Sequence, residues 1–226
     1  MDLASKMDAI AAAGESTIRA DVAALRAHGV DSWERLVATV HAGDPALRAR
    51  AVWLLGRLDG EDAGPPLAVA LGDDTAAVRA EAARSLATLG DPRSTPRLIE
   101  LLASDPDDDV RVACAYALGL MPDEVGTDAL VRTLADRLQP VRVRAMAAES
   151  LVGADATRAT PALLEGLVDA AAEVRFWSAF AVGENDVAAA TPILRQMARD
   201  DRGTTDHGDV AAEAAAALAR IGRPHP

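Results

Sequence analysis

The sequence predicts an all-α fold, a solenoid of about six helical hairpins. Three observations support this: a segment that recurs every 31 to 36 residues, an apolar content dominated by Ala, Leu and Val, and the lack of strand-like alternation. Half of the 226 residues are apolar, but only six are aromatic. A core of small, helix-compatible side chains favours closely packed helices.

The recurring segment is a helix with four regular columns. Its six copies begin at Leu47, Val78, Val110, Val143, Val174 and Val210, and we number offsets from these residues. Offset 1 is arginine in five copies, offset 4 is always small, offset 8 is always a branched aliphatic residue, and offset 12 is always Asp, Gly or Pro, which stop helices. Four columns that agree over six copies indicate a repeat array.

Another helix-forming stretch precedes each copy. These stretches lie near residues 32–40, 65–71, 96–102, 128–134, 161–168 and 192–198. Three of them open with Thr-Pro, in which Thr caps a helix and Pro suits the first helical position. We therefore expect Pro96, Pro161 and Pro192 at helix starts. Residues 1–30 are expected to form a helical cap or degenerate repeat, 31–222 a single repeat domain, and 223–226 a disordered tail.

Charge and cysteine content narrow the classes of partner. The chain has 35 acidic and 23 basic residues, a net charge of −12, which disfavours nucleic acid and anionic membranes. Cys114 is the single cysteine, and it falls in the small, buried column at offset 4. With no secretory signal and no long apolar run, these features predict a cytoplasmic protein without a membrane span.

The sequence contains no catalytic constellation. It therefore favours a non-enzymatic role, and no cofactor or metal is expected. There is no Ser/His/Asp set, Gly-rich phosphate loop or CxxC pair, and the acidic insertion at 200–209 does not match a calcium loop. The arginine column is expected to be structural, bonding to aspartates of neighbouring loops. The candidate aspartates are Asp44, Asp73, Asp74, Asp105, Asp107, Asp169 and Asp206.

The aromatic residues suggest a binding surface. If offsets 0, 4, 5, 8 and 11 form the buried stripe, offsets 2 and 6 point away from it and offset 3 lies on its flank. Large apolar residues at these outer offsets are typical anchors for a partner. They are Trp53, Tyr116, Met146, Phe176, Trp177 and Phe180. Charged companions expected to orient the partner are Arg50, Arg57, Arg84, Glu149 and Glu184. The alternative is that these rings pack between adjacent helices as part of the fold.

Residues 78–91, Val-Arg-Ala-Glu-Ala-Ala-Arg-Ser-Leu-Ala-Thr-Leu-Gly-Asp, resemble the short HEAT-like repeat named after phycobilisome (bilin) lyases. The resemblance covers about residues 30 to 222. It implies a right-handed superhelix whose second helices line a concave face. Members of the family include bilin lyases, a metal hydroxylase and signalling adaptors. The hydroxylase branch binds iron through His-Glu pairs, whereas no histidine here is followed by Glu.

Three functions are compatible with these features. The leading hypothesis is a protein-interaction scaffold or adaptor that binds a partner helix or peptide on the concave face. The second, implied by the resemblance, is a bilin lyase or chromophore chaperone, which would work as a hetero-oligomer of two such chains. The third is a HEAT-like DNA glycosylase, which the net charge opposes.

Overall fold

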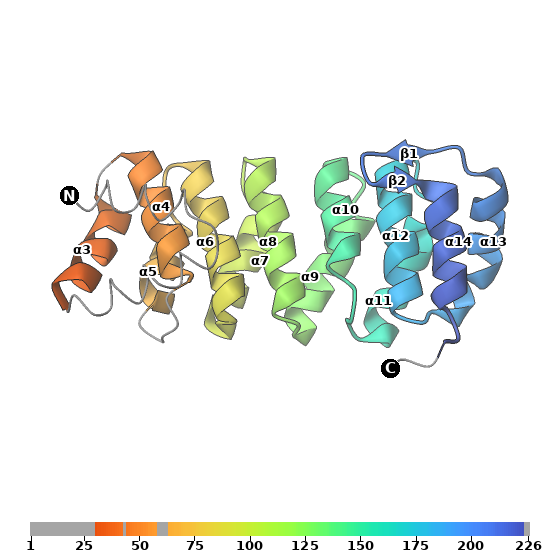
Figure 1. Cartoon of the computed structure of the whole chain (residues 1–226), viewed down its shortest axis with the longest axis horizontal. Coiled ribbons are helices and arrows are strands. Elements are labelled where there is room, and N and C mark those ends of the chain that lie inside the picture. The colour runs from red at the N-terminus through yellow and green to blue at the C-terminus, as the bar shows by residue number, and fades with distance from the viewer. Residues whose placement is uncertain (1–29, 43, 58–62, 224–226) are drawn as a thin grey trace. The chain divides into compact units, whose positions relative to one another are not determined.

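A computed structural model describes residues 30–42, 44–57 and 63–223. In these residues it contains α-helices, two short 3₁₀ helices and one small β-hairpin (Figure 1). The protein is therefore an all-α helical repeat solenoid, as its sequence predicts. The expected N-terminal cap and nearly all of the expected tail lie outside the described residues. No helix in the described part has the length and apolarity needed to cross a membrane.

Two kinds of helix alternate along the chain. The first helix of each hairpin is α3 (Val30–His41), α5 (Gly64–Ala70), α7 (Thr95–Ser104), α9 (Glu124–Ala135), α11 (Ala156–Gly166) or α13 (Thr191–Asp200). The second helices, which carry the repeat columns, are α4 (Pro45–Leu55), α6 (Ala76–Leu89), α8 (Asp108–Leu120), α10 (Val141–Glu149), α12 (Ala172–Glu184) and α14 (Val210–Arg220). The 3₁₀ helices are η2 (Pro92–Ser94) and η3 (Ala188–Ala190), and the antiparallel hairpin pairs β1 (Thr204–Thr205) with β2 (Gly208–Asp209).

The helices divide into two compact units, and the division of the chain falls between Arg97 and Leu98. In unit one, α4 packs against both α3 and α6, and α5 packs on α6. In unit two, the second helices α8, α10, α12 and α14 stand side by side in chain order (Figure 1). There α9 packs on α10, α11 on α12, and α13 on α14. Each second helix of unit two therefore has one side against a first helix and another side available for surface residues.

The predicted columns form the core. Every offset 4 residue, including Cys114, is fully buried, and so is every offset 8 residue from Leu55 to Val182. Leu47 and Leu218, at the two ends of the six-copy series, are only half-buried. The regular burial follows from the 3.6-residue helical period, which keeps these offsets on one stripe.

Neighbouring second helices approach closely through a small-residue column that the sequence analysis did not identify. A Cβ atom added to Gly183 would lie 2.8 Å from the Cα atom of Ala217, so glycine is required for this approach of α12 and α14. Glycine at offset 9 meets a small residue at offset 7 of the next copy in three places. The pairs are Gly56–Ser85, Gly119–Ser150 and Gly183–Ala217.

One expected helix start is wrong. Pro96 and Pro192 are the second residues of α7 and α13, close to their predicted positions. Pro161 instead lies inside α11, which begins five residues earlier. The reason is Asp155, whose carboxylate accepts a hydrogen bond from the Arg158 backbone N–H at 3.0 Å and caps the earlier start. Pro161 then removes one backbone hydrogen bond from the second turn.

Candidate partner-binding surface

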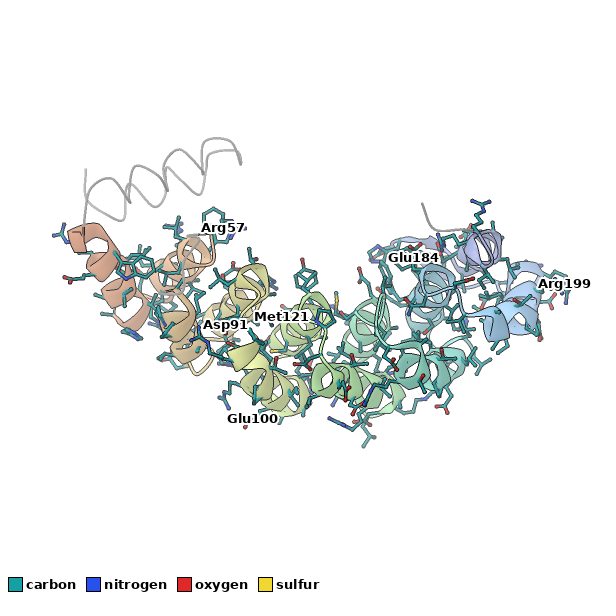
Figure 2. All side chains as sticks on the ribbon, turned by 90° about the horizontal axis from the view of Figure 1, so that it is seen from below. Arg57, Asp91, Glu100, Met121, Glu184 and Arg199 are labelled. Atoms are coloured by element: carbon teal, nitrogen blue, oxygen red, sulfur yellow. The ribbon has the colours of Figure 1, made fainter. Side chains whose placement is uncertain are left out.

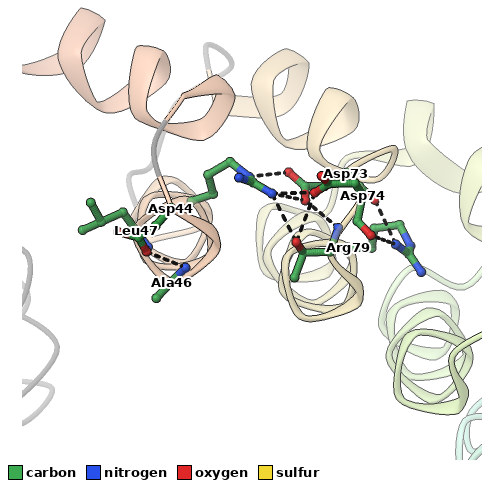
Figure 3. Close-up of polar contacts among 8 residues, drawn as sticks. Asp44, Ala46, Leu47, Asp73, Asp74 and Arg79 are labelled. Carbon is green, nitrogen blue, oxygen red and sulfur yellow. Dashed lines mark hydrogen bonds and ion pairs between the residues drawn. The ribbon is translucent and has the colours of Figure 1, made fainter.

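The arginine column belongs to the fold, as predicted. Arg48 donates two hydrogen bonds of 2.8 Å to Asp73, which lies in the loop of the next copy (Figure 3). Arg175 forms the same paired contact with Asp201, at 2.6 and 2.8 Å. Arg144 bonds to Asp169 one copy on. These arginines bridge consecutive repeats through bidentate or buried ion pairs.

Two arginines of this column have partners other than those expected. Arg111 pairs with Asp108 of its own helix. Arg175 pairs with Asp201, at the start of the 200–209 insertion, and Asp201 was not among the candidate aspartates. Asp201 stands 26 residues after Arg175, close to the 25 residues that separate Arg48 from Asp73 and Arg144 from Asp169, and the remaining residues of the insertion follow it.

The bridging aspartates also shape their own loops. Asp73 accepts a hydrogen bond from the backbone N–H of Thr75 at 2.8 Å, and Asp201 accepts one from Gly203 at 2.7 Å. The hydrogen bond from Arg175 lowers the pKa of Asp201, although burial opposes it. For Asp169, burial alone would raise the pKa, but hydrogen bonds from Ala171 and Arg144 lower it overall. Each carboxylate is thus held in its charged form by two repeats at once.

Unit two presents apolar residues on the outer side of its second helices. We call offsets 3, 6 and 10 of these helices the second-helix face. On α8, the Tyr116 side chain is 44 % exposed, and Leu120 is exposed one turn later. On α10, Met146 is half-buried. On α12, Trp177 and Phe180 are half-buried, with their ring centroids 5.6 Å apart in an edge-to-face arrangement. Tyr116 and Leu120 are therefore the most accessible apolar groups of this face.

Phe176 does not share this exposure. The sequence predicts that it points away from the core toward a partner, but its side chain is only 7 % exposed. The β1–β2 hairpin covers it: the ring of His207 lies 6.1 Å away, and a Cβ atom added to Gly208 would lie 3.8 Å from the Phe176 ring. The expected accessibility of Phe176 is therefore wrong, because the 200–209 insertion folds back over α12.

His207 ties the hairpin to α12. Its ring centroid is 4.9 Å from that of Trp177, and its Nε2 atom is 3.8 Å from the carboxylate of Glu173. Arg175 holds the base of the same loop through Asp201. Within the described residues, no three His, Cys, Asp or Glu side chains are grouped so that they could hold a metal ion. The insertion thus covers Phe176 and contacts Trp177.

The charged residues on the second-helix face of unit two are paired with one another except for Glu149. Arg220 lies 3.2 Å from Glu184, also bonds to Glu213, and has its guanidinium 5.2 Å from the centre of the Phe180 ring. Figure 2 shows Glu184 on the second-helix side of this unit. Glu149, the last residue of α10, is half-buried, and within the described part of the chain it has no hydrogen bond or ion pair.

Unit one has its own aromatic and charged cluster. The Arg57 guanidinium lies 3.8 Å from the centre of the Trp53 ring and donates to the Trp53 carbonyl at 3.2 Å. Arg57 projects outward beyond α4 (Figure 2). Arg84 lies 3.4 Å from Glu81, whose pKa is raised by burial against the opposing charge of Arg84 and Arg57. Arg50 is exposed. The structure thus gathers the predicted site residues into separate clusters, one in each unit.

This two-layered array of helical hairpins defines an α-solenoid repeat protein, and comparison with known proteins gives its type. Residues 33–119 match the family described as HEAT repeats, and residues 110–136 match the PBS lyase HEAT-like repeat. The chain thus contains HEAT repeats over residues 33–136, including one of the PBS lyase type. No curated protein matched its sequence.

Solved structures show the same fold at low identity. The structure of YIBA_ECOLI, from Escherichia coli, is 19 % identical with a TM-score of 0.56, over 97 % of this chain and 93 % of that one. An engineered protein (target OR366) is 21 % identical with a TM-score of 0.56, over 84 % and 98 %. A designed armadillo repeat protein in complex with the peptide (KR)4 is 18 % identical with a TM-score of 0.54, over 83 % and 98 %.

Proposed function

We propose that the chain is a non-enzymatic scaffold of the cytoplasm that binds a partner protein through the second-helix face of unit two. The observation that carries this proposal is the exposed pair Tyr116 and Leu120, which stand one helical turn apart on α8. These exposed apolar groups share the second-helix face with half-buried Trp177 and Phe180 on α12, with α10 between them. Such a face suits an interface in which aromatic anchors are desolvated by the partner. The peptide complex of the designed armadillo neighbour supports a peptide or helix as the bound element.

The test uses capture of partners by the full chain immobilised on a resin and exposed to extract of its own host. The variant Tyr116→Ala/Phe180→Ala should lose the captured protein, because both anchors are removed. Leu138→Ala is the matched control, since Leu138 is 94 % exposed but lies in the loop between α9 and α10. The control should capture as the unchanged chain does.

The same variants need a stability measurement. Tyr116→Ala/Phe180→Ala should keep its helical circular dichroism and nearly its thermal midpoint. Capture that survives in this variant contradicts the proposal. If the double variant melts much earlier, the rings belong to the core, and Tyr116→Ala alone then decides the question. Bilin binding, the alternative favoured by the PBS lyase-type repeat, stays a prediction that an absorbance titration with bilin tests.

A further inference from the structure

Glu149 differs from the other carboxylates of the second-helix face in unit two. Glu184 and Glu213 share Arg220, and Glu173, beside the face, lies 3.8 Å from His207. Glu149 has no such partner among the described residues, although its side chain is half-buried. Leaving a partly desolvated carboxylate without a cation costs free energy, so an incoming cation would be favoured at this position.

The register of the repeat places Glu149 between two aromatic residues. It occupies offset 6 of its copy, and the same offset is Tyr116 in the copy before and Phe180 in the copy after. α10 packs against both α8 and α12. Because axes of packed helices are about 8–10 Å apart, these three side chains form a row across the face, in the order Tyr, Glu, Phe. The row combines one carboxylate with two aromatic faces.

Another part of unit two already combines carboxylates and an aromatic ring around one arginine. Arg220 bonds to Glu184 and Glu213 while its guanidinium lies 5.2 Å from the centre of the Phe180 ring. A planar guanidinium can accept both kinds of contact, a bidentate bond to a carboxylate and stacking on an aromatic face. Arg220 contacts Phe180, at one end of the row, whereas Glu149 itself has no hydrogen bond or ion pair among the described residues.

We propose that the second-helix face of unit two binds a basic peptide segment, with an arginine side chain of the partner seated on Glu149 between Tyr116 and Phe180. The inference rests on the proposed function and specifies the chemistry of the partner. The net charge of −12 complements such a segment. Burial raises the pKa of Glu149, and the charge of His207 offsets only part of that effect, as expected for a carboxylate that lacks a close cation.

The experiment measures binding of two labelled peptides to the full chain by fluorescence anisotropy at physiological salt. One probe is (KR)4, and the other is the same peptide with every arginine replaced by citrulline, which keeps the side-chain shape and the lysine charges but removes the guanidinium charges. Two variants are compared, Glu149→Gln and Glu165→Gln. Glu165 is exposed on α11, so its replacement makes the same change in net charge away from the face.

The unchanged chain should prefer (KR)4 to the citrulline peptide, and Glu149→Gln should weaken (KR)4 binding by roughly tenfold or more, as for loss of a charge-assisted hydrogen bond. Glu165→Gln should bind as the unchanged chain does. The inference is overturned if the chain does not bind (KR)4 at millimolar peptide, if it does not distinguish the two peptides, or if both variants weaken equally. None of these results affects host-partner capture through Tyr116 and Phe180, so the two proposals can fail separately.

Discussion

The buried ion pair of Asp169 and Arg144 allows a quantitative test of the arginine ladder. The Asp169 side chain is 1 % exposed and accepts hydrogen bonds from Arg144, from Arg137 and from the Ala171 backbone N–H. Arg144 is buried as well. Asp169→Ala would leave its guanidinium buried without a carboxylate. Breaking a buried pair in this way costs about 3–5 kcal/mol of unfolding free energy.

A surface pair in the same unit provides the control. Arg142 and Asp109 lie 2.9 Å apart, but both side chains are 64 % exposed. Asp109→Ala also removes one carboxylate from an ion pair, so it changes the net charge equally. Because water screens this pair, its loss should cost only about 0–1 kcal/mol. The difference in lost unfolding free energy between the two variants therefore measures the effect of burial, since both remove one negative charge.

Urea unfolding followed by circular dichroism and tryptophan fluorescence gives the two free energies. With Trp33 and Trp53 replaced by Phe, Trp177 reports on unit two alone. Adding Arg144→Met to Asp169→Ala should recover part of the loss, since the stranded charge is then gone. The reasoning is refuted if Asp169→Ala destabilises unit two no more than Asp109→Ala does.

Two further predictions concern helix packing and pH. Gly183→Val should lower the thermal midpoint and reduce the free energy of unfolding by about 1–3 kcal/mol or more. The reason is that the new side chain would meet the backbone of Ala217 and push α12 away from α14. An unchanged midpoint would contradict the close approach of these helices. The folded-state pKa of Asp201 lies below its ordinary value of 3.8, so the stability from its pairing is present above that pH and lost as pH falls through the lowered pKa. The difference in unfolding free energy between the unchanged chain and Asp201→Asn should thus be constant above about pH 5 and shrink in acid, and a difference that does not vary with pH would exclude the pairing as its source.

The fold was predictable because its core depends on local periodicity. Offsets 4 and 8 identify buried residues such as Cys114 and Leu118 directly, since the helical period alone decides which side chains share a stripe. The arginine ladder was predictable for a related reason: the recurrence of Arg at offset 1 and of Asp in the loops required a repeated partner. Pro161 was misplaced because a nearby aspartate cap outweighed the usual preference of proline for a helix start.

The surface was less predictable because it depends on long-range packing. Phe176 has the offset of an exposed residue, and only the path of the 200–209 hairpin buries it. The absence of a partner for Glu149 likewise depends on where the arginines of neighbouring helices point. One signal was available in the sequence, however: glycine at offset 9 recurs at Gly56, Gly119 and Gly183, and it marks the close approach of the second helices.

Each loop aspartate both shapes its own loop and binds the arginine of the preceding copy, and this double role determines where a repeat tolerates an insertion. Asp73 and Asp169 stand five residues before the next copy begins, whereas Asp201 stands nine residues before it. The preceding span, from the arginine to the aspartate that it binds, is 25 residues for Arg48 and 26 for Arg175. Residues inserted after the aspartate leave its turn and its docking intact. A loop can therefore be inserted just after this aspartate without breaking the pair with arginine. The hairpin over α12 occupies this position.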